Sequence, residues 1–81
     1  MNTTEAKLII LINSVDEKDR NVYFLSNKLE KSFSATYNYL RLLEAGDYIA
    51  RFKSISGKKF YQVKSELAVN EAKNILLGEE E

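Results

Sequence analysis

Four polar side chains with hydrogen-bonding groups recur at intervals of three and four residues near the middle of this chain. They are Ser34, Tyr37, Asn38 and Arg41. On a helix this spacing places all four side chains on one side. An asparagine amide can bond an adenine edge at two points, and a guanidinium can do the same with guanine. Ser34 and Tyr37 can reach phosphates or a thymine methyl group. The set suits contact with a DNA duplex, although a polar helix face is more often only a solvated one.

Basic residues gather in the segment that follows this polar set. Residues 48–64 contain five cations and no acid, whereas the whole chain has 12 basic and 12 acidic residues. The local field, and not the net charge of zero, decides where a polyanion docks. Four of these cations are expected to contact phosphates or the minor groove: Arg51, Lys53, Lys58 and Lys59. Lysine on an exposed strand also discourages edge pairing, so the role of each single cation stays open.

The polar set must be carried by a helix, which we predict over residues 33–45. Its buried stripe is formed by Thr36, Leu40 and Leu43, which recur at spacings of four and three. Ser32 suits the N-cap of this helix, because its hydroxyl can accept a hydrogen bond from an unpaired backbone N–H. The side of the helix opposite the stripe is then free to enter a major groove.

A shorter helix is predicted just before it, over about residues 22–30. Leu25 and Leu29 lie one turn apart on this helix. The two helices together form a helix-turn-helix over about residues 22–45. A Gly-Asp pair at positions 46–47 ends the second helix, because both residue types tolerate left-handed backbone angles.

Two strands rich in aromatic and β-branched residues are predicted over residues 49–55 and 59–63, within a wing of about residues 48–64. The Ser-Gly pair at positions 56–57 supplies the turn. If the turn has two residues, one apolar face covers the helices and consists of Ala50, Phe52, Tyr61 and Val63. The opposite face then carries Arg51, Lys53, Lys58, Phe60 and Gln62. A three-residue loop would shift this register.

The outer helices are predicted over about residues 4–15 and 65–77, with Gly78 ending the last one. The apolar run from Leu8 to Ile12 cannot all face one small core, because five consecutive helical residues point in every direction. This favours a homodimer formed through the first and last helices. The competing possibility is a monomer in which the last helix lies across the first.

The chain has no cysteine and no histidine, which removes disulfides, thiolate metal sites and the commonest general base. We therefore expect no enzyme activity, no catalytic, metal-binding or cofactor-binding residue, and no cofactor. A core this small also leaves little room for a small-molecule ligand. The longest apolar run has five residues, far short of the ~20 that span a bilayer. The sequence predicts a reduced, cytoplasmic protein without a membrane partner.

Three segments resemble parts of winged helix-turn-helix transcriptional regulators. LSNKLEKS from Leu25 looks like their positioning helix and turn, YNYLRLLEAGDYIAR from Tyr37 like their recognition helix and first wing strand, and KKFYQV from Lys58 like the returning strand. The resemblance covers nearly the whole chain and extends to compact regulators of archaea and their viruses and plasmids. One departure is Asp47, which stands where these proteins usually place a turn glycine.

The resemblance implies an α+β fold and one winged-helix domain over residues 1–81, with a three-helix core, a two-stranded wing and a C-terminal helix. It further implies sequence-specific binding of double-stranded DNA and a role in transcription regulation. A winged helix that binds another protein, within a transcription or replication assembly, is the alternative. The neutral net charge and the apolar outer helices would suit that role.

Overall fold

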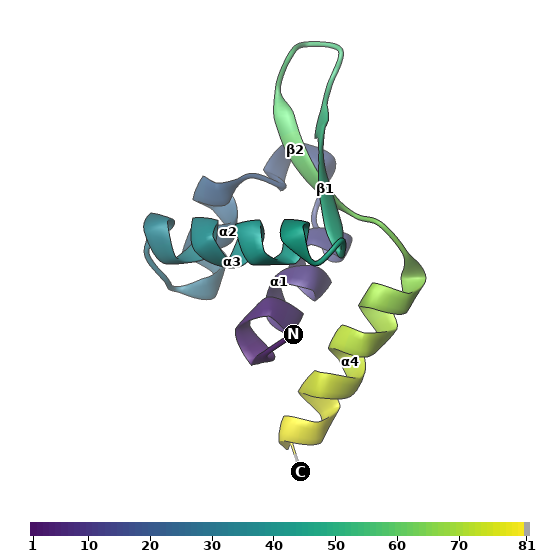
Figure 1. The fold of residues 1–81 in the computed structure, drawn as a ribbon. Helices are drawn as coiled ribbons and strands as arrows, with labels where there is room; N and C mark the ends of the chain where they lie inside the picture. Colours follow the sequence, from purple (N-terminus) through teal and green to yellow (C-terminus); the bar gives the residue numbers. More distant parts are fainter. Residues whose placement is uncertain (81) are drawn as a thin grey trace.

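The computed structural model of this protein describes residues 1–80 and the side chains of residues 1–78. Its elements, in chain order, are α1 (Thr3–Ser14), the short 3-10 helix η1 (Glu17–Asp19), α2 (Val22–Leu29), α3 (Phe33–Ala45), β1 (Ile49–Lys53), β2 (Lys59–Val63) and α4 (Glu66–Glu80). Figure 1 shows that the two strands form a hairpin beside α3, as the predicted α+β layout requires. The side chains of the three terminal glutamates are outside the described part.

The helix-turn-helix begins and ends at capping residues. The Asn21 side chain accepts a hydrogen bond from the Phe24 N–H at 2.9 Å, and the Ser32 hydroxyl accepts one from the Ala35 N–H at 3.1 Å. Each satisfies a backbone donor that a helix N-terminus leaves unpaired. At the end of α2, Glu30 adopts a left-handed conformation with φ 56°. The predicted bounds of α3 are confirmed, and α2 ends one residue earlier than predicted.

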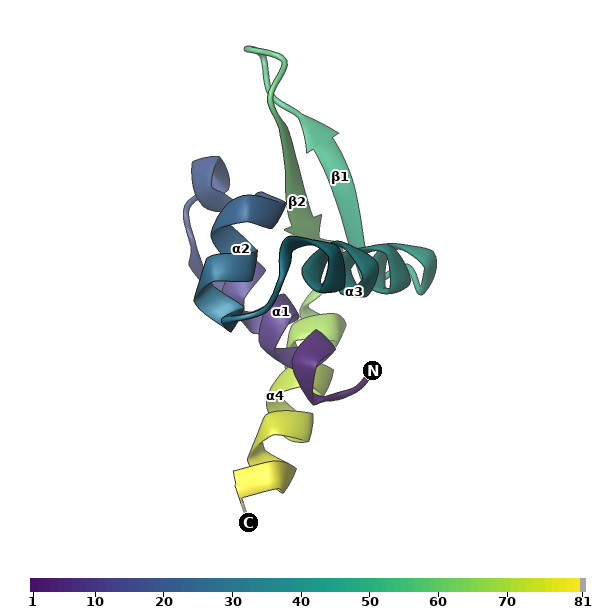
Figure 2. The same ribbon diagram turned by 90° about the vertical axis from the view of Figure 1, so that its left-hand side faces the viewer.

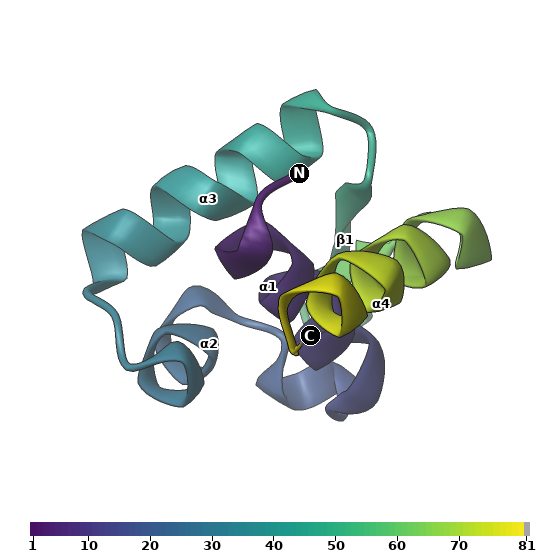
Figure 3. The ribbon, with the colours of Figure 1, turned by 90° about the horizontal axis from the view of Figure 1, so that it is seen from below.

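Helix α1 lies at the centre of the molecule, between α3, α2 and α4 (Figure 3). Its Leu8, Ile9 and Ile12 have no exposed surface, and its Ile10 and Leu11 are half-buried against the core. The prediction that the apolar run of α1 is left partly uncovered is therefore largely wrong. It is covered because α4 packs along α1, while α2, α3 and β2 pack around the rest of it.

The predicted stripe of α3 is confirmed, since Thr36, Leu40 and Leu43 are all fully buried. Thr36 is the polar residue of the stripe, and its buried hydroxyl has no hydrogen-bond partner in the described chain. A buried polar group without a partner costs free energy that an apolar group of the same shape does not.

We expect Thr36→Val to raise the free energy of unfolding by roughly 1 kcal/mol, because it replaces the unpaired hydroxyl with a methyl group. Urea unfolding followed by circular dichroism measures this. Thr36→Ser is the matched control, since it keeps the hydroxyl, loses the methyl group and should destabilise the fold. A Thr36→Val variant no more stable than the wild type would contradict the prediction.

The hairpin has a different register from the one predicted. Its loop has five residues, 54–58, and the strands pair Arg51 with Tyr61 and Lys53 with Lys59. The register is shifted by one residue from that of a two-residue turn, and such a shift exchanges the two faces of one strand. The observed face toward the helices consists of Ile49, Arg51, Lys53, Lys59, Tyr61 and Val63. The outer face consists of Ala50, Phe52, Phe60 and Gln62.

The wing and α4 project from opposite ends of the molecule, which measures 43 × 26 × 22 Å (Figure 2). The prediction that Gly78 ends α4 is wrong, because the helix continues to Glu80. At the base of the wing, the Tyr61 N–H donates to the Arg20 carbonyl at 3.1 Å, so the segment after η1 borders the free edge of β2. The wing is thus anchored on both α3 and the loop before α2.

Candidate nucleic-acid interface

The polar face predicted on α3 is exposed in the structure. Ser34, Tyr37, Asn38 and Arg41 are all on the surface, on the side of the helix away from the buried stripe. Asn38 and Arg41 line one shallow hollow together with two small or apolar neighbours. The structure therefore brings the two residues predicted to read base edges next to each other.

The joint between α3 and the wing is fixed by Asp47. This residue adopts a left-handed conformation with φ 66°, which aspartate reaches more easily than most other side chains. The next residue, Tyr48, donates its N–H to the Leu43 carbonyl at 3.0 Å. The Asp47 carboxylate also accepts a hydrogen bond from Lys64 at the end of β2. Aspartate thus takes the place expected for a turn glycine and ties both wing strands to the helix.

Arg51 does not lie free on the wing. Its guanidinium donates a hydrogen bond to the Glu44 carboxylate of α3 at 3.1 Å. This hydrogen bond, with the charge of Glu44, raises the pKa of Arg51 above its ordinary value. Burial raises the pKa of the adjacent Tyr61 phenol, and the Arg51 charge partly opposes that shift. Two of the five cations of residues 48–64 therefore have acidic partners. Arg51 pairs with Glu44 of α3, and Lys64 pairs with Asp47 just after α3.

If the corner between α3 and the wing meets phosphates, Glu44 opposes binding there. We expect Glu44→Gln to tighten binding to duplex DNA and to steepen the salt dependence of log K by about one unit, because Arg51 becomes free for a phosphate. Fluorescence anisotropy across a salt series measures both. Glu71→Gln, at an exposed acid on α4, is the control. An unchanged slope in the Glu44 variant would place Arg51 outside the interface.

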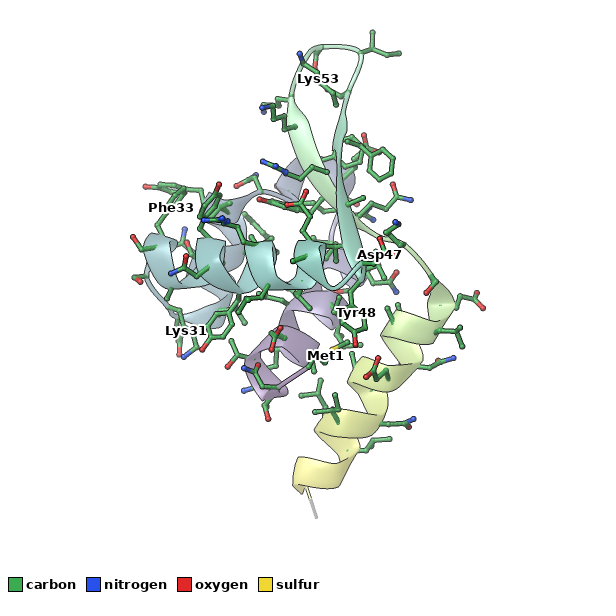
Figure 4. All side chains as sticks on the ribbon, in the orientation of Figure 1. Met1, Lys31, Phe33, Asp47, Tyr48 and Lys53 are labelled. Atoms are coloured by element: carbon green, nitrogen blue, oxygen red, sulfur yellow. The ribbon has the colours of Figure 1, made fainter. Side chains whose placement is uncertain are left out.

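The remaining wing cations are free of acidic partners within the described chain. Lys53, Lys58 and Lys59 form no ion pair there. Lys53 and Lys59 line a hollow with Arg51 and Glu44, between the hairpin and the end of α3. Lys58 lies in the loop at the tip, and Figure 4 shows Lys53 high on the wing, well above α3. The structure thus places Arg51, Lys53 and Lys59 on one side of the wing, from the corner with α3 toward the tip.

Sequence reasoning missed two residues of this surface. Glu44 is not among the residues predicted to contact DNA. It lies seven residues after Tyr37, however, and therefore on the same side of α3. Phe33 begins α3 and is 54% exposed at the end of the helix away from the wing (Figure 4). Helix angle could have found Glu44, whereas the register that brings Arg51 to it depends on the length of the hairpin loop.

The described residues offer no metal site and no membrane span. Within residues 1–80, no group of three or more acidic, cysteine or histidine side chains could hold a metal ion. No helix in that part of the chain is long and apolar enough to cross a membrane. The surface of α3 and the wing joins hydrogen-bonding side chains to cations without an acidic partner in that part of the chain.

Neither a protein-family model nor a curated protein sequence matches this chain. Solved structures do match in fold. A mutant of MepR from Staphylococcus aureus has a TM-score of 0.81 at 14% identity, over 99% of this chain and 61% of that one. Another MepR mutant, bound to an oligodeoxyribonucleotide, has a TM-score of 0.76 at 15% identity, over 95% and 59%. A double mutant of Lactococcus lactis ZitR in apo form has a TM-score of 0.68 at 22% identity, over 96% and 57%.

These likenesses confirm the predicted fold, a winged helix-turn-helix with a C-terminal helix. The chain spans about three fifths of the length of these structures. MepR is described as a transcription regulator of the multidrug efflux pump MepA and is also seen bound to ethidium bromide. For this chain, the absence of a small-molecule ligand stays a prediction. The source organisms give no support to the resemblance to archaeal regulators.

Proposed function

We propose that this protein is a sequence-specific double-stranded DNA-binding protein that regulates transcription, and that it is not an enzyme. In this proposal α3 enters the major groove, where Asn38 and Arg41 read base edges. Ser34 and Tyr37 contact phosphates or a thymine methyl group at the margins of the groove. The wing lies on phosphates or in the adjacent minor groove, with Lys53, Lys58 and Lys59 as its principal contacts and Arg51 at the corner.

One observation carries the proposal. The exposed polar face of α3 and the cationic face of the wing meet at a corner, where Arg51 links them through Glu44. A duplex presents the matching features, with base edges in the groove and phosphates along its rims. The oligodeoxyribonucleotide bound to a MepR mutant of the same fold supports this use of the winged helix.

Selection of bound duplexes from a random pool tests the sequence-specific part of this proposal. We expect enrichment of one site, with a preferred adenine or guanine at positions that change when Asn38 or Arg41 is replaced. A pool that stays random after several rounds, despite measurable binding, would reduce the function to nonspecific DNA binding.

The alternative function is a winged-helix module that binds another protein in a transcription or replication assembly. Exposed apolar residues outside the α3 face favour it, since Leu67 and Leu77 of α4 are 79% and 61% exposed. Failure to bind any duplex, together with a protein partner lost on substitution of these leucines, would support this alternative.

We further propose a homodimer in which the outer side of α4 contributes to the interface. Its buried side, which includes Ala68 and Ala72, faces α1, so Leu67 and Leu77 point outward. Twofold symmetry would place two recognition helices about 34 Å apart, one DNA turn, and select a palindromic site. The close packing of α4 on α1 also suits the competing monomer.

Sedimentation at micromolar concentration tests the dimer. We expect a mass near twice 9.3 kDa for the wild type and near 9.3 kDa for Leu77→Asp, with the fold intact because Leu77 is exposed. Lys18→Asp, at an exposed lysine of η1 outside α4, is the control for added charge. A wild-type mass near 9.3 kDa would favour the monomer.

A further inference from the structure

The tip of the wing carries a large apolar side chain with no role in the fold. Ile55 has a relative exposure of 110%, the highest value among the exposed large hydrophobic residues of the described chain. It was predicted to belong to a strand, but it lies in the loop 54–58, outside both strands. A side chain that touches so little of its own protein contributes little to stability and is free to contact a partner.

The loop holds this side chain in a defined position. The Ser54 N–H donates to the Lys58 carbonyl at 2.8 Å, and the Gly57 N–H donates to the Ser54 carbonyl at 2.9 Å. The Ser54 hydroxyl accepts the Lys58 N–H at 3.2 Å and lies 2.9 Å from the Ser56 hydroxyl. Gly57 takes φ 88°, which most other residues would reach only with strain. A preformed tip loses little conformational entropy when it binds.

Cations surround the tip on the strands and loop beside it. Lys53 and Lys59 face each other directly across the hairpin, an arrangement of like charges that destabilises a strand pair. With Lys58 they form a group without an acidic partner in the described chain. Below them the rings of Phe52 and Phe60 stack, with 5.9 Å between the ring centroids, and stiffen the hairpin. An anionic surface would relieve the repulsion among the lysines.

The occupant must therefore present anions around a slot that accepts an apolar side chain. The DNA minor groove meets both conditions, because phosphates line its two edges and apolar wedges, isoleucine among them, can enter between its base steps. A lipid surface also attracts cations and apolar groups. It would, however, engage only the tip. Lys53 and Lys59 lie on the same hairpin face as Arg51, and Arg51 contacts α3. A single duplex can therefore contact both the tip and α3.

We propose that Ile55 is a wedge that inserts into the minor groove beside the major groove occupied by α3, and that it bends the duplex toward the major groove. This inference rests on the proposed function. The three lysines hold the tip over the phosphates on both sides of the insertion. Insertion partly unstacks one base step, so flexible pyrimidine–purine steps are favoured there. A guanine amino group in the groove floor hinders it.

Bending is measured by energy transfer between dyes at the ends of a duplex of about 30 base pairs, alongside affinity by anisotropy. We expect Ile55→Ser to lose most of the bend and to bind about tenfold more weakly, as loss of one buried isoleucine side chain implies. Replacing guanine by inosine at the wedge step should strengthen wild-type binding and leave the Ile55→Ser variant unchanged. Tyr23→Ser, at an exposed tyrosine of α2, is the matched control, and both variants should have the melting temperature of the wild type.

If the wild type binds duplex DNA and Ile55→Ser binds and bends it equally well, the wedge is refuted while the proposed function stands. If the wild type binds no duplex, both fail together. Binding to vesicles of phosphatidylserine, lost in Ile55→Ser, would then assign the tip to a membrane instead.

Discussion

Arg41→Ala is expected to weaken binding to the selected site by about 1–3 kcal/mol, or roughly 5- to 150-fold in Kd. The reason is that a guanidinium bonded to a guanine edge at two points is lost, while the exposed helix face keeps a good helix former. Asn38→Ala should have an effect of similar size through an adenine. Preference should relax at one or two base pairs for each variant. Anisotropy with the selected duplex and its single-base variants measures both quantities.

The control for these two variants is Asn13→Ala, an exposed amide on α1 that should leave binding unchanged. Thermal melting shows whether the fold is preserved. If Arg41→Ala and Asn38→Ala lose affinity equally for all sequences, these residues contact phosphates and do not read bases. Unchanged affinity in a variant lacking Asn38, Arg41, Lys58 and Lys59 together would rule out the whole binding mode.

The triple variant Lys53→Ala, Lys58→Ala and Lys59→Ala is also expected to have a large effect on DNA binding and on its salt dependence. Each phosphate contact contributes about 0.9 to the slope of log K against log salt, so three lost contacts flatten it by about 2.7. Affinity for random and selected duplexes should fall alike, by roughly 10- to 100-fold near 0.1 M salt. Sequence preference should stay the same, because the wing lysines position the protein and α3 reads the bases.

The matched control replaces Lys7 and Lys73, exposed lysines of α1 and α4, by alanine. It removes positive charge from the rest of the molecule and should change the slope little. A slope that falls equally in the control and in the wing variant would show that the effect comes from total charge and not from the wing.

Local signals predicted the helix-turn-helix well. The Ser32 cap, the stripe of Thr36, Leu40 and Leu43, and the outward side of α3 all follow from short-range spacing, and the structure confirms each. The end of α4 was less predictable. Glycine lowers helix propensity only modestly, so Gly78 did not stop a helix that packs along α1.

The sequence did not predict which side chains share a face of the wing, because successive side chains of a strand point to opposite faces. A loop of five residues instead of two changed which side chains share a face. Arg51 was expected to project toward DNA, yet the actual register brings it to Glu44. The same uncertainty hid Ile55, which the strand pattern assigned to the sheet and the structure places at the tip.

Chemical-shift mapping with a duplex tests the central claim most directly, because it reports where DNA meets the protein residue by residue. A chain of 9.3 kDa gives well-resolved amide spectra. We predict that the largest shifts on adding duplex DNA fall in two ranges, residues 32–42 and residues 51–60. Amides on the outer side of α4 should stay unchanged. Shifts concentrated on α4, with α3 and the wing unaffected, would contradict the account and favour a winged helix that binds its partner through other surfaces.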